Sequence, residues 1–340
     1  MHAAGVEPYD ALLVLSFGGP EQPDDVLPFL ENVTRGRNVP RERLLEVAEH
    51  YHHFGGKSPI NDQNRALIDA LTREFEQHGP RLPIYFGNRN WHPFLADSVR
   101  EMAAQGVRRA LVFFTSAFSS YSGCRQYREN IEAAQREVGP AAPRLDRLRM
   151  FFNHPLFIET MVGRVSQSLE TIPADRRAGT PLVFTAHSIP LGMAQNCEYE
   201  AQLREACRLV AASFPGHAWQ LTYQSRSGPP TQPWLAPDIL DALRELARQG
   251  TKDVVVLPIG FISDHLEVLY DLDIEARQLS DSLGLNMVRA GTAGTAPKFV
   301  AMIRELVLER VEPGHPRRAL GTLGPSHDVC AADCCLPPQR

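Results

Sequence analysis

The chain has 340 residues, of which 43% are hydrophobic and 22% are charged, and its formal net charge is −5 at pH 7. This composition is typical of a soluble globular protein with a sizeable core. The absence of a basic excess or a basic run disfavours a nucleic-acid partner. No apolar run approaches the roughly 20 residues of a membrane-spanning helix, and residues 1–10 have neither part of a signal peptide, so we predict a cytoplasmic protein without a transmembrane segment. No heptad seam appears, which favours a monomer.

Short apolar runs alternate with amphipathic stretches along the whole chain. The apolar runs predict strands over 10–16, 83–87, 109–115, 147–153, 182–186, 219–224, 253–259 and 287–290. The amphipathic stretches predict helices over 65–77, 97–105, 156–169, 238–249 and 296–309. Nearly continuous apolar strands that alternate with helices indicate parallel sheets covered on both faces.

Four strands followed by four more predict an α/β protein of two Rossmann-like domains, each a four-stranded parallel sheet flanked by helices. The first domain would span 1–155, with the C-terminal segment 296–340 packing back near it, and the second would span 156–295. Ligands of open parallel sheets bind beyond the carboxyl ends of the strands, so these ends can face one active cleft. The glycine pair Gly18–Gly19 lacks the dinucleotide-binding spacing, which disfavours nucleotide chemistry.

A histidine stands where one predicted strand ends, within Thr185–Pro190. Imidazole titrates near neutral pH, so His187 is a candidate metal ligand or general base. A histidine satisfied by backbone groups at a strand end is the alternative, and this segment alone leaves both interpretations open.

Acidic residues recur after the predicted strand 253–259. On a helix, Glu267, Asp271 and Glu275 would form one stripe, and Asp264 would extend it. A solvated helix face is the alternative, but such faces usually intersperse basic residues, and the first one here is Arg277. Because like charges at this spacing repel each other, the row suits a hydrated divalent cation or a proton relay.

Six cysteines are too few for a disulfide framework in a chain of this length. Cys197 and Cys207 fall in a helical stretch and are expected to be structural. Cys330, Cys334 and Cys335 crowd the C-terminal tail. These thiols suit a metal site, zinc included, and a disordered tail with free thiols is the alternative.

Five segments resemble motifs of the ferrochelatase family, in the family's order and over nearly the whole chain. They are Leu12–Pro20, Tyr51–Pro59, Thr185–Pro190, Tyr223–Gly228 and Pro258–Asp273. The resemblance is closest to actinobacterial ferrochelatases of the coproporphyrin-dependent branch. It implies a lyase-class metal chelatase of haem b biosynthesis, whose two Rossmann-like domains flank a porphyrin cleft. It also implies coproporphyrin III and Fe²⁺ as substrates, with protoporphyrin IX as the alternative porphyrin.

The resemblance assigns chemical roles to the acidic stripe and to the histidine. It implies that His187 and Glu267 are the metal-binding catalytic pair, and that Asp264, Asp271 and Glu275 form an acidic path.

The resemblance also implies the residues that contact the porphyrin. Tyr51, Ser58 and Tyr127 match positions that touch the macrocycle or its propionates. The resemblance implies that Arg35 would be a propionate partner, a role that suits guanidinium because it pairs with carboxylate through two hydrogen bonds. Phe17 departs from the family pattern: some relatives carry there a tyrosine proposed as an axial metal ligand, and phenylalanine cannot ligate.

Ferrochelatases that carry a [2Fe–2S] cluster resemble this chain in having one internal cysteine and a C-terminal group. The resemblance implies Cys124, Cys330, Cys334 and Cys335 as the four ligands such a cluster needs. Its role would be structural or sensing.

Two interpretations from other classes remain. A non-catalytic porphyrin or haem carrier would need the cleft but not the carboxylates, so replacing Glu267 would leave its function intact. An iron–sulfur redox sensor on an inactive chelatase fold is the other, and the presence of both His187 and Glu267 disfavours it.

Overall fold

The structure, a computed structural model, describes residues 8–36, 39–228 and 231–337. Contacts within the chain define two compact units, each with one sheet. The first contains Met1–Thr115, Gln126–Arg149 and Val300–Arg317, and the second contains Ser116–Arg125, Met150–Phe299 and Arg318–Arg340. The predicted segment 296–340 is therefore divided between the units, and the domain boundary at residue 155 stays a prediction.

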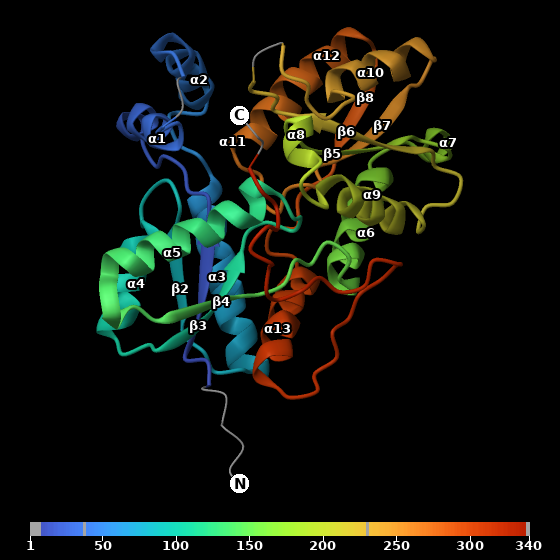
Figure 1. Cartoon of the computed structure of the whole chain (residues 1–340). Coiled ribbons are helices and arrows are strands. Elements are labelled where there is room, and N and C mark those ends of the chain that lie inside the picture. The colour runs from blue at the N-terminus through green and yellow to red at the C-terminus, as the bar shows by residue number, and fades with distance from the viewer. Residues whose placement is uncertain (1–7, 37–38, 229–230, 338–340) are drawn as a thin grey trace. The chain divides into compact units, whose positions relative to one another are not determined.

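The first unit is built on a four-stranded parallel sheet (Figure 1). The strand order is β2 (Ile84–Asn88), β1 (Ala11–Ser16), β3 (Arg109–Phe114) and β4 (Arg144–Arg147). Every residue of β1 and β3 is buried. Both central strands are thus covered on two faces, which explains why their sequences are apolar without alternation.

Helices accompany this sheet in the first unit. They are η1 (Pro23–Asp25), α1 (Val26–Val33), α2 (Arg41–His53), α3 (Ile60–His78), α4 (Leu95–Ala104), α5 (Gln126–Val138), η3 (Gly139–Ala141) and the part of α13 (Pro297–Val311) from Val300 onward. α3 buries Leu67, Leu71 and Phe75, spaced four residues apart, and it contacts β1 and β2. α1 and α2 pack on each other around Phe29.

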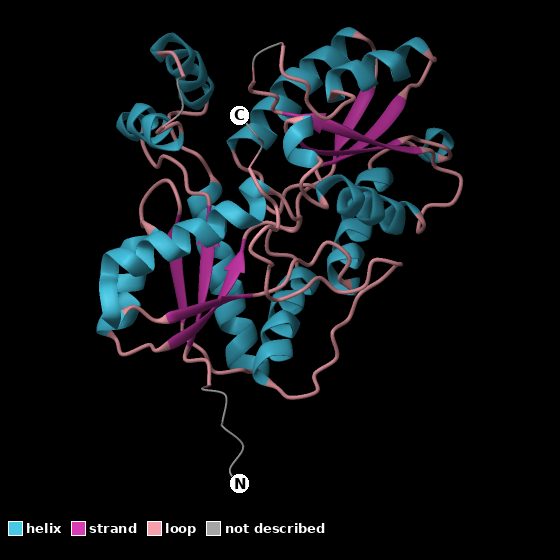
Figure 2. Ribbon diagram, in the orientation of Figure 1, coloured by secondary structure: helices cyan, strands magenta, loops and turns pink. Residues whose placement is uncertain are grey.

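The second unit repeats the design with strand order β6 (Trp219–Gln224), β5 (Leu182–His187), β7 (Asp253–Leu257) and β8 (Asn286–Arg289), all parallel. Its helices (Figure 2) are η2 (Tyr121–Arg125), α6 (Pro155–Glu170), α7 (Ala174–Arg177), α8 (Leu191–Ala194), α9 (Tyr199–Ala211), α10 (Ile239–Arg248), α11 (Leu266–Val268), η4 (Leu269–Ala276) and α12 (Arg277–Ser282). One core cluster joins Val183 and Val256 of the sheet to Leu243 of α10 and Leu272 of η4. This packing fixes η4 against the strands.

The predicted fold class is confirmed by the two four-stranded parallel sheets with flanking helices. One strand prediction was wrong in position: 147–153 was expected, whereas β4 ends at Arg147. Residues 150–152 are buried without strand structure, and the Phe151 ring lies 5.5 Å from that of Phe157 on α6. Their hydrophobicity reflects burial in an irregular connection, and periodicity cannot distinguish such a run from a buried strand.

The backbone of the C-terminal tail is tied to the rest of the second unit by hydrogen bonds to side chains. The side-chain amide of Asn153 donates to the carbonyls of Leu320 (3.1 Å) and Gly324 (2.8 Å). A carboxylate oxygen of Glu205 accepts from the amide of Thr322 at 3.0 Å. These bonds order a segment whose sequence has no apolar period.

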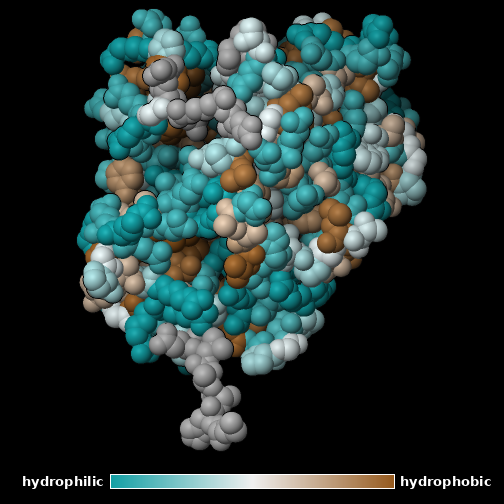
Figure 3. Space-filling view, in the orientation of Figure 1, coloured by the Kyte–Doolittle hydropathy of each residue, from teal (hydrophilic) through white to brown (hydrophobic). Residues whose placement is uncertain are grey.

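Apolar residues on the face shown in Figure 3 occupy small, separate areas among hydrophilic ones. Within the described parts of the chain, no helix combines the length and the apolar character needed to cross a membrane.

We predict that Glu309→Gln lowers the free energy of unfolding by about 3–5 kcal/mol, because it leaves a buried arginine without its charge partner. Both oxygens of Glu309 accept from Arg149, at 2.7 and 2.8 Å, and both side chains are 1% exposed. Urea unfolding measures the loss. The control is Glu137→Gln, in the exposed pair with Arg100, for which about 0–1 kcal/mol is expected. Equal losses of unfolding free energy in Glu309→Gln and Glu137→Gln would contradict the assignment of a buried, stabilising ion pair to Arg149 and Glu309.

Candidate active site

Strand β5 carries His187 to its carboxyl end. The two preceding residues, Thr185 and Ala186, are fully buried, whereas the His187 side chain is 34% exposed. Ring atom Nδ1 contacts the Ser188 carbonyl oxygen, which can only accept, so the neutral ring keeps its proton on Nδ1. The hydroxyl of Tyr199 donates to the His187 carbonyl at 3.0 Å. The lone pair of Nε2 is thereby available as a base.

Glu267 lies on α11, opposite this lone pair. Its Oε2 is 3.7 Å from Nε2 of His187, and its side chain is 48% exposed. This separation is too long for a hydrogen bond. A first-row divalent ion binds imidazole nitrogen and carboxylate oxygen at about 2.1 Å each, so one ion can reach both atoms. The predicted pair is therefore brought together by the structure.

The acidic row continues into η4, which is a π-helix rather than the α-helix that the i, i+4 spacing of the acidic residues would suit. π-Helices are rare and are concentrated at functional sites. Asp271 lies on η4 next to β6, where the Ser225 hydroxyl donates to its Oδ2. Burial, reinforced by the charges of Glu267 and Glu275, raises the pKa of Asp271 to about 7 against the hydrogen bond from Ser225. Burial likewise raises the pKa of Glu275.

Gln224 joins the histidine strand to the acidic helix through one buried amide. The residue is 1% exposed. Its Oε1 accepts from the hydroxyl of Thr185 on β5 at 3.1 Å. Its Nε2 donates to the Glu267 carbonyl (3.3 Å) and to Oδ2 of Asp271 (3.2 Å). The register between the two catalytic candidates is therefore held by a side chain that sequence reasoning did not single out.

Asp264 is placed differently from the other acidic residues. It precedes α11 and pairs with Arg289 at 2.7 Å. Arg289, the last residue of β8, also binds both carboxylate oxygens of Asp273, at 2.7 and 2.8 Å. Asp264, expected to extend the acidic stripe, thus forms an ion pair with Arg289, which is distant in sequence and compensates its negative charge.

His265 is a further titratable group near the acidic row that was not among the predicted site residues. Burial lowers its pKa, the charge of Glu267 raises it, and the charge of His187 lowers it again. Its ring packs edge-on against Phe261, with 5.0 Å between the centroids. In the sequence it stands two residues before Glu267, a position that marks it as a candidate site residue.

The expected porphyrin contacts lie in the first unit. Tyr51 is half-buried on α2, with its ring 5.9 Å from that of Phe29. Ser58 is buried just before α3, and Tyr127 is buried on α5. Arg35 is exposed in the turn after α1.

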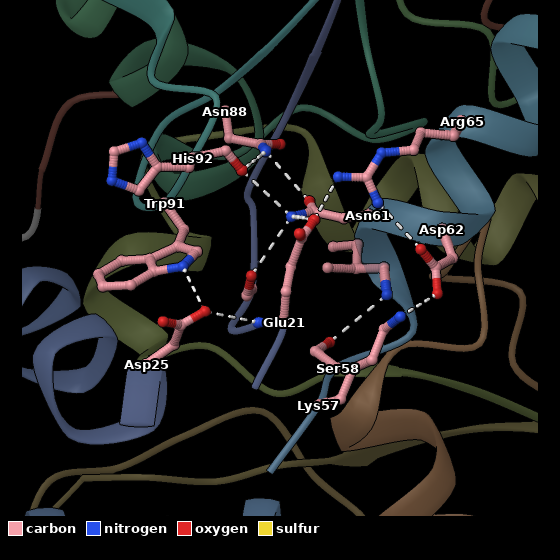
Figure 4. A network of polar contacts seen from close by, with 12 residues as sticks. Glu21, Asp25, Lys57, Ser58, Asn61, Asp62, Arg65, Asn88, Trp91 and His92 are labelled. Atoms are coloured by element: carbon pink, nitrogen blue, oxygen red, sulfur yellow. Dashed lines mark hydrogen bonds and ion pairs between the residues drawn. The ribbon is translucent and has the colours of Figure 1, made fainter. Parts of the chain in front are cut away.

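A polar network surrounds Ser58 and fixes the loops after β1 and β2 (Figure 4). The Asn61 amide donates to Glu21 (2.9 Å) and to the His92 carbonyl (3.1 Å), while its oxygen accepts from Asn88 (3.0 Å). The backbone amide of Ser58 donates to the Pro20 carbonyl at 2.8 Å. The glycine at position 18, with φ +85°, allows the close approach of Asn88, since a Cβ there would lie 2.9 Å from that of Asn88.

Arg89 is a cation at the carboxyl end of β2 that was not among the predicted site residues. Its guanidinium carbon lies 4.5 Å from the ring centroid of Tyr127 and 5.6 Å from that of Phe17. Its Nε donates to Asn130 at 2.7 Å. A half-buried guanidinium held between aromatic rings is suited to bind a carboxylate.

Four cysteines gather in the second unit. The Sγ atoms of Cys124, on η2, and Cys330 are 3.9 Å apart, and those of Cys334 and Cys335 are 3.5 Å apart. Ligand atoms of His327, Cys330 and Cys334 all lie within 4.8 Å of one another. No disulfide joins any of the six cysteines, all of which lie in the described part of the chain. The four that were predicted to act together are thus arranged as two close pairs, an arrangement that fits a cluster with two irons.

The fold is that of metal chelatases. The chain is similar to the structure "SirB from Bacillus subtilis with Fe3+", with a TM-score of 0.57 and 10% identity over 91% of this chain and 98% of that chain. It is also similar to the sirohydrochlorin chelatase SirB from Bacillus subtilis subspecies spizizenii in complex with cobalt, with a TM-score of 0.52 and 12% identity over 89% and 96% of the two chains.

Within this fold the chain belongs to the ferrochelatase family, whose model matches residues 9–311. A relative named ferrochelatase, from Rhodopirellula baltica, is 61% identical over 98% of this chain and 95% of its own. Relatives named coproporphyrin III ferrochelatase come from Frankia alni, 55% identical over 97% and 87% of the two chains, and from Streptomyces coelicolor, 53% identical over 96% and 93%. The predicted family is confirmed.

The raised pKa of Asp271 predicts a pH-dependent stability. Well below pH 4 the Asp271 carboxyl is neutral in both the folded and the unfolded chain. As the pH rises through about 7, the free energy of unfolding falls, because the buried carboxyl must then carry a charge in the folded chain. We expect Asp271→Asn to abolish this loss. The variant should gain about 1–4 kcal/mol over the unsubstituted protein between pH 4.5 and pH 8. Urea unfolding at both pH values measures the gain, with exposed Asp281→Asn as the control. A pH-independent difference would contradict the assignment.

Proposed function

We propose that this chain inserts Fe²⁺ into coproporphyrin III to give Fe-coproporphyrin III in haem b biosynthesis. The observation that carries the proposal is the pairing of His187 and Glu267 at 3.7 Å, with Asp271 and Glu275 behind them on a π-helix. Relatives named coproporphyrin III ferrochelatase, at 53–55% identity over nearly the whole chain, support this porphyrin.

The reaction exchanges two pyrrole protons for one ferrous ion, and both protons must leave the site. His187, with its Nδ1 proton held by the Ser188 carbonyl, accepts a pyrrole proton at Nε2 as a general base. Glu267 stabilises the resulting imidazolium or presents the iron. Asp271, with a pKa of about 7, changes protonation state near neutral pH, and Glu275 continues the row. Together they form the acidic path that carries protons away.

The porphyrin is bound by the residues that the family motifs indicate. Tyr51, Ser58 and Tyr127 contact the macrocycle or its propionates, and Arg35 pairs with a propionate. Binding energy from these contacts can hold the macrocycle bent, which turns the nitrogen lone pairs out of its plane toward the iron. Phe17 supplies no metal ligand. Asp264, compensated by Arg289, belongs to the outer end of the acidic path. We expect the enzyme to act as a cytoplasmic monomer, and the lack of a basic excess disfavours a nucleic-acid partner.

Substitution of the catalytic pair tests the proposal. We expect His187→Ala and Glu267→Gln each to lower kcat for anaerobic Fe²⁺ insertion into coproporphyrin III by about 10²–10⁴-fold, the usual contribution of a positioned acid or base. Soret absorbance follows the reaction. Asp281→Asn, an exposed carboxylate on α12, is the matched control and should retain full activity. Unchanged iron insertion by Glu267→Gln would contradict the role of Glu267, whereas porphyrin binding without iron insertion by the unsubstituted chain would instead support a porphyrin carrier.

We further propose that Cys124, Cys330, Cys334 and Cys335 hold a [2Fe–2S] cluster. The two close thiol pairs support this ligand set. Arg125 assists by donating from Nη1 to the carbonyls of Ala332 (2.8 Å) and Cys334 (2.9 Å), which holds the tail beside Cys124. Bound there, the cluster would supply one-electron redox chemistry apart from the catalytic pair, in a structural or sensing role.

Cluster content tests this ligand set directly. Protein isolated without oxygen should contain about two iron and two sulfide per chain, as a [2Fe–2S] centre requires. Cys335→Ser should lose both, because a cluster iron then lacks a thiolate. Cys207→Ala, buried on α9, is the control and should keep them. A full complement of iron and sulfide in Cys335→Ser would exclude Cys335 as a ligand.

A further inference from the structure

A histidine lies beside the cysteines in the tail. His327, Cys330 and Cys334 have ligand atoms that all lie within 4.8 Å of one another, in the spacing H-x₂-C-x₃-C. Cys124 adds a fourth ligand atom, 3.9 Å from the sulfur of Cys330. These four side chains offer three thiolates and one imidazole, a ligand set found in closed structural zinc sites.

Cys335 is set apart from this group. Its backbone has φ +51°, a left-handed conformation that is uncommon for a residue with a Cβ, and the residue is 3% exposed. It contacts the sulfur of Cys334 at 3.5 Å. A site with one metal ion therefore has four ligands without Cys335, whereas the four-thiolate cluster needs it.

We propose that the tail binds a single divalent ion of the zinc class through Cys124, His327, Cys330 and Cys334 when no iron–sulfur cluster is present. Soft thiolates together with imidazole select such ions over Mg²⁺ and Ca²⁺. Binding of M²⁺ releases three thiol protons and leaves the site with a net charge of −1. The guanidinium of Arg125, which is bonded to the carbonyls of Ala332 and Cys334, supplies a positive charge at the same loop.

This site is distinct from the catalytic pair and from the cluster proposed above, although it shares three thiols with the cluster. The mononuclear ion and the cluster therefore exclude each other. Binding of the ion closes the loop between η2 and the tail, since ligands come from both, and metal-binding free energy then stabilises the folded tail. The chain thus has two forms of its C-terminal tail, which differ in whether His327 or Cys335 is a ligand.

Cobalt(II) is the probe that separates the possibilities, because thiolate-to-cobalt charge-transfer absorption reports sulfur ligands and is silent for the His187–Glu267 pair. Full-length, reduced, cluster-free protein is titrated anaerobically with Co²⁺ alone. We expect one equivalent to develop the charge-transfer band. His327→Ala should weaken Co²⁺ binding at least tenfold while its iron and sulfide content after cluster reconstitution stays unchanged. Cys335→Ser should keep tight Co²⁺ binding and should lose its iron and sulfide after cluster reconstitution. Exposed His53→Ala is the control.

Co²⁺ binding by His327→Ala as tight as that of the unsubstituted chain would overturn the inference, and so would loss of the charge-transfer band in Cys335→Ser. If no cluster can be reconstituted in any form while the one-equivalent cobalt band depends on His327, the cluster proposal fails and the mononuclear site stands. Thermal unfolding with and without Co²⁺ checks that each variant is folded.

Discussion

The buried amide of Gln224 is the interaction on which the candidate active site depends most. It accepts from Thr185 on the histidine strand, and it donates to the backbone and to a carboxylate of the acidic segment. Thr185 is fully buried, and without this amide Asp271 would lose a donor that it has besides the Ser225 hydroxyl, so removal of the amide is costly. The amide therefore fixes how β5 and η4 lie against each other. The distance between His187 and Glu267 follows from that register.

His187 and Glu267, the proposed catalytic pair, are half-exposed on a rigid support. The residues under it in β5 are fully buried, and the apolar face of η4 packs into the core of the second unit through Leu272. A base on a buried strand end keeps its orientation, while its exposed ring atom remains open to substrate. Asp271 lies deeper than Glu267, and its raised pKa follows from that depth. The exposed carboxylate of Glu267 is thus followed along the acidic row by the buried carboxyl group of Asp271.

Much of the fold and of the site was predictable, for identifiable reasons. Buried parallel strands are apolar without interruption, so seven of the eight strand predictions overlap the observed strands closely. The eighth failed over 148–153, because a buried run without strand pairing has the same hydrophobic signature. His187 and Glu267 were predictable from local motifs. Gln224, Arg289 and Arg89 were not, because their roles arise from contacts across the fold. The π-helix at η4 was not predictable either, since its i, i+4 acidic spacing also suits an α-helix.

The most direct test of the central claim is a side-by-side assay of the purified, unsubstituted protein with Fe²⁺ and either coproporphyrin III or protoporphyrin IX, without oxygen and followed by Soret absorbance. We expect both absorbance changes to report metallation, with coproporphyrin III metallated faster than protoporphyrin IX. Binding of both porphyrins with no iron insertion would contradict the central claim, because the pairing of His187 with Glu267 would then have no chemical consequence.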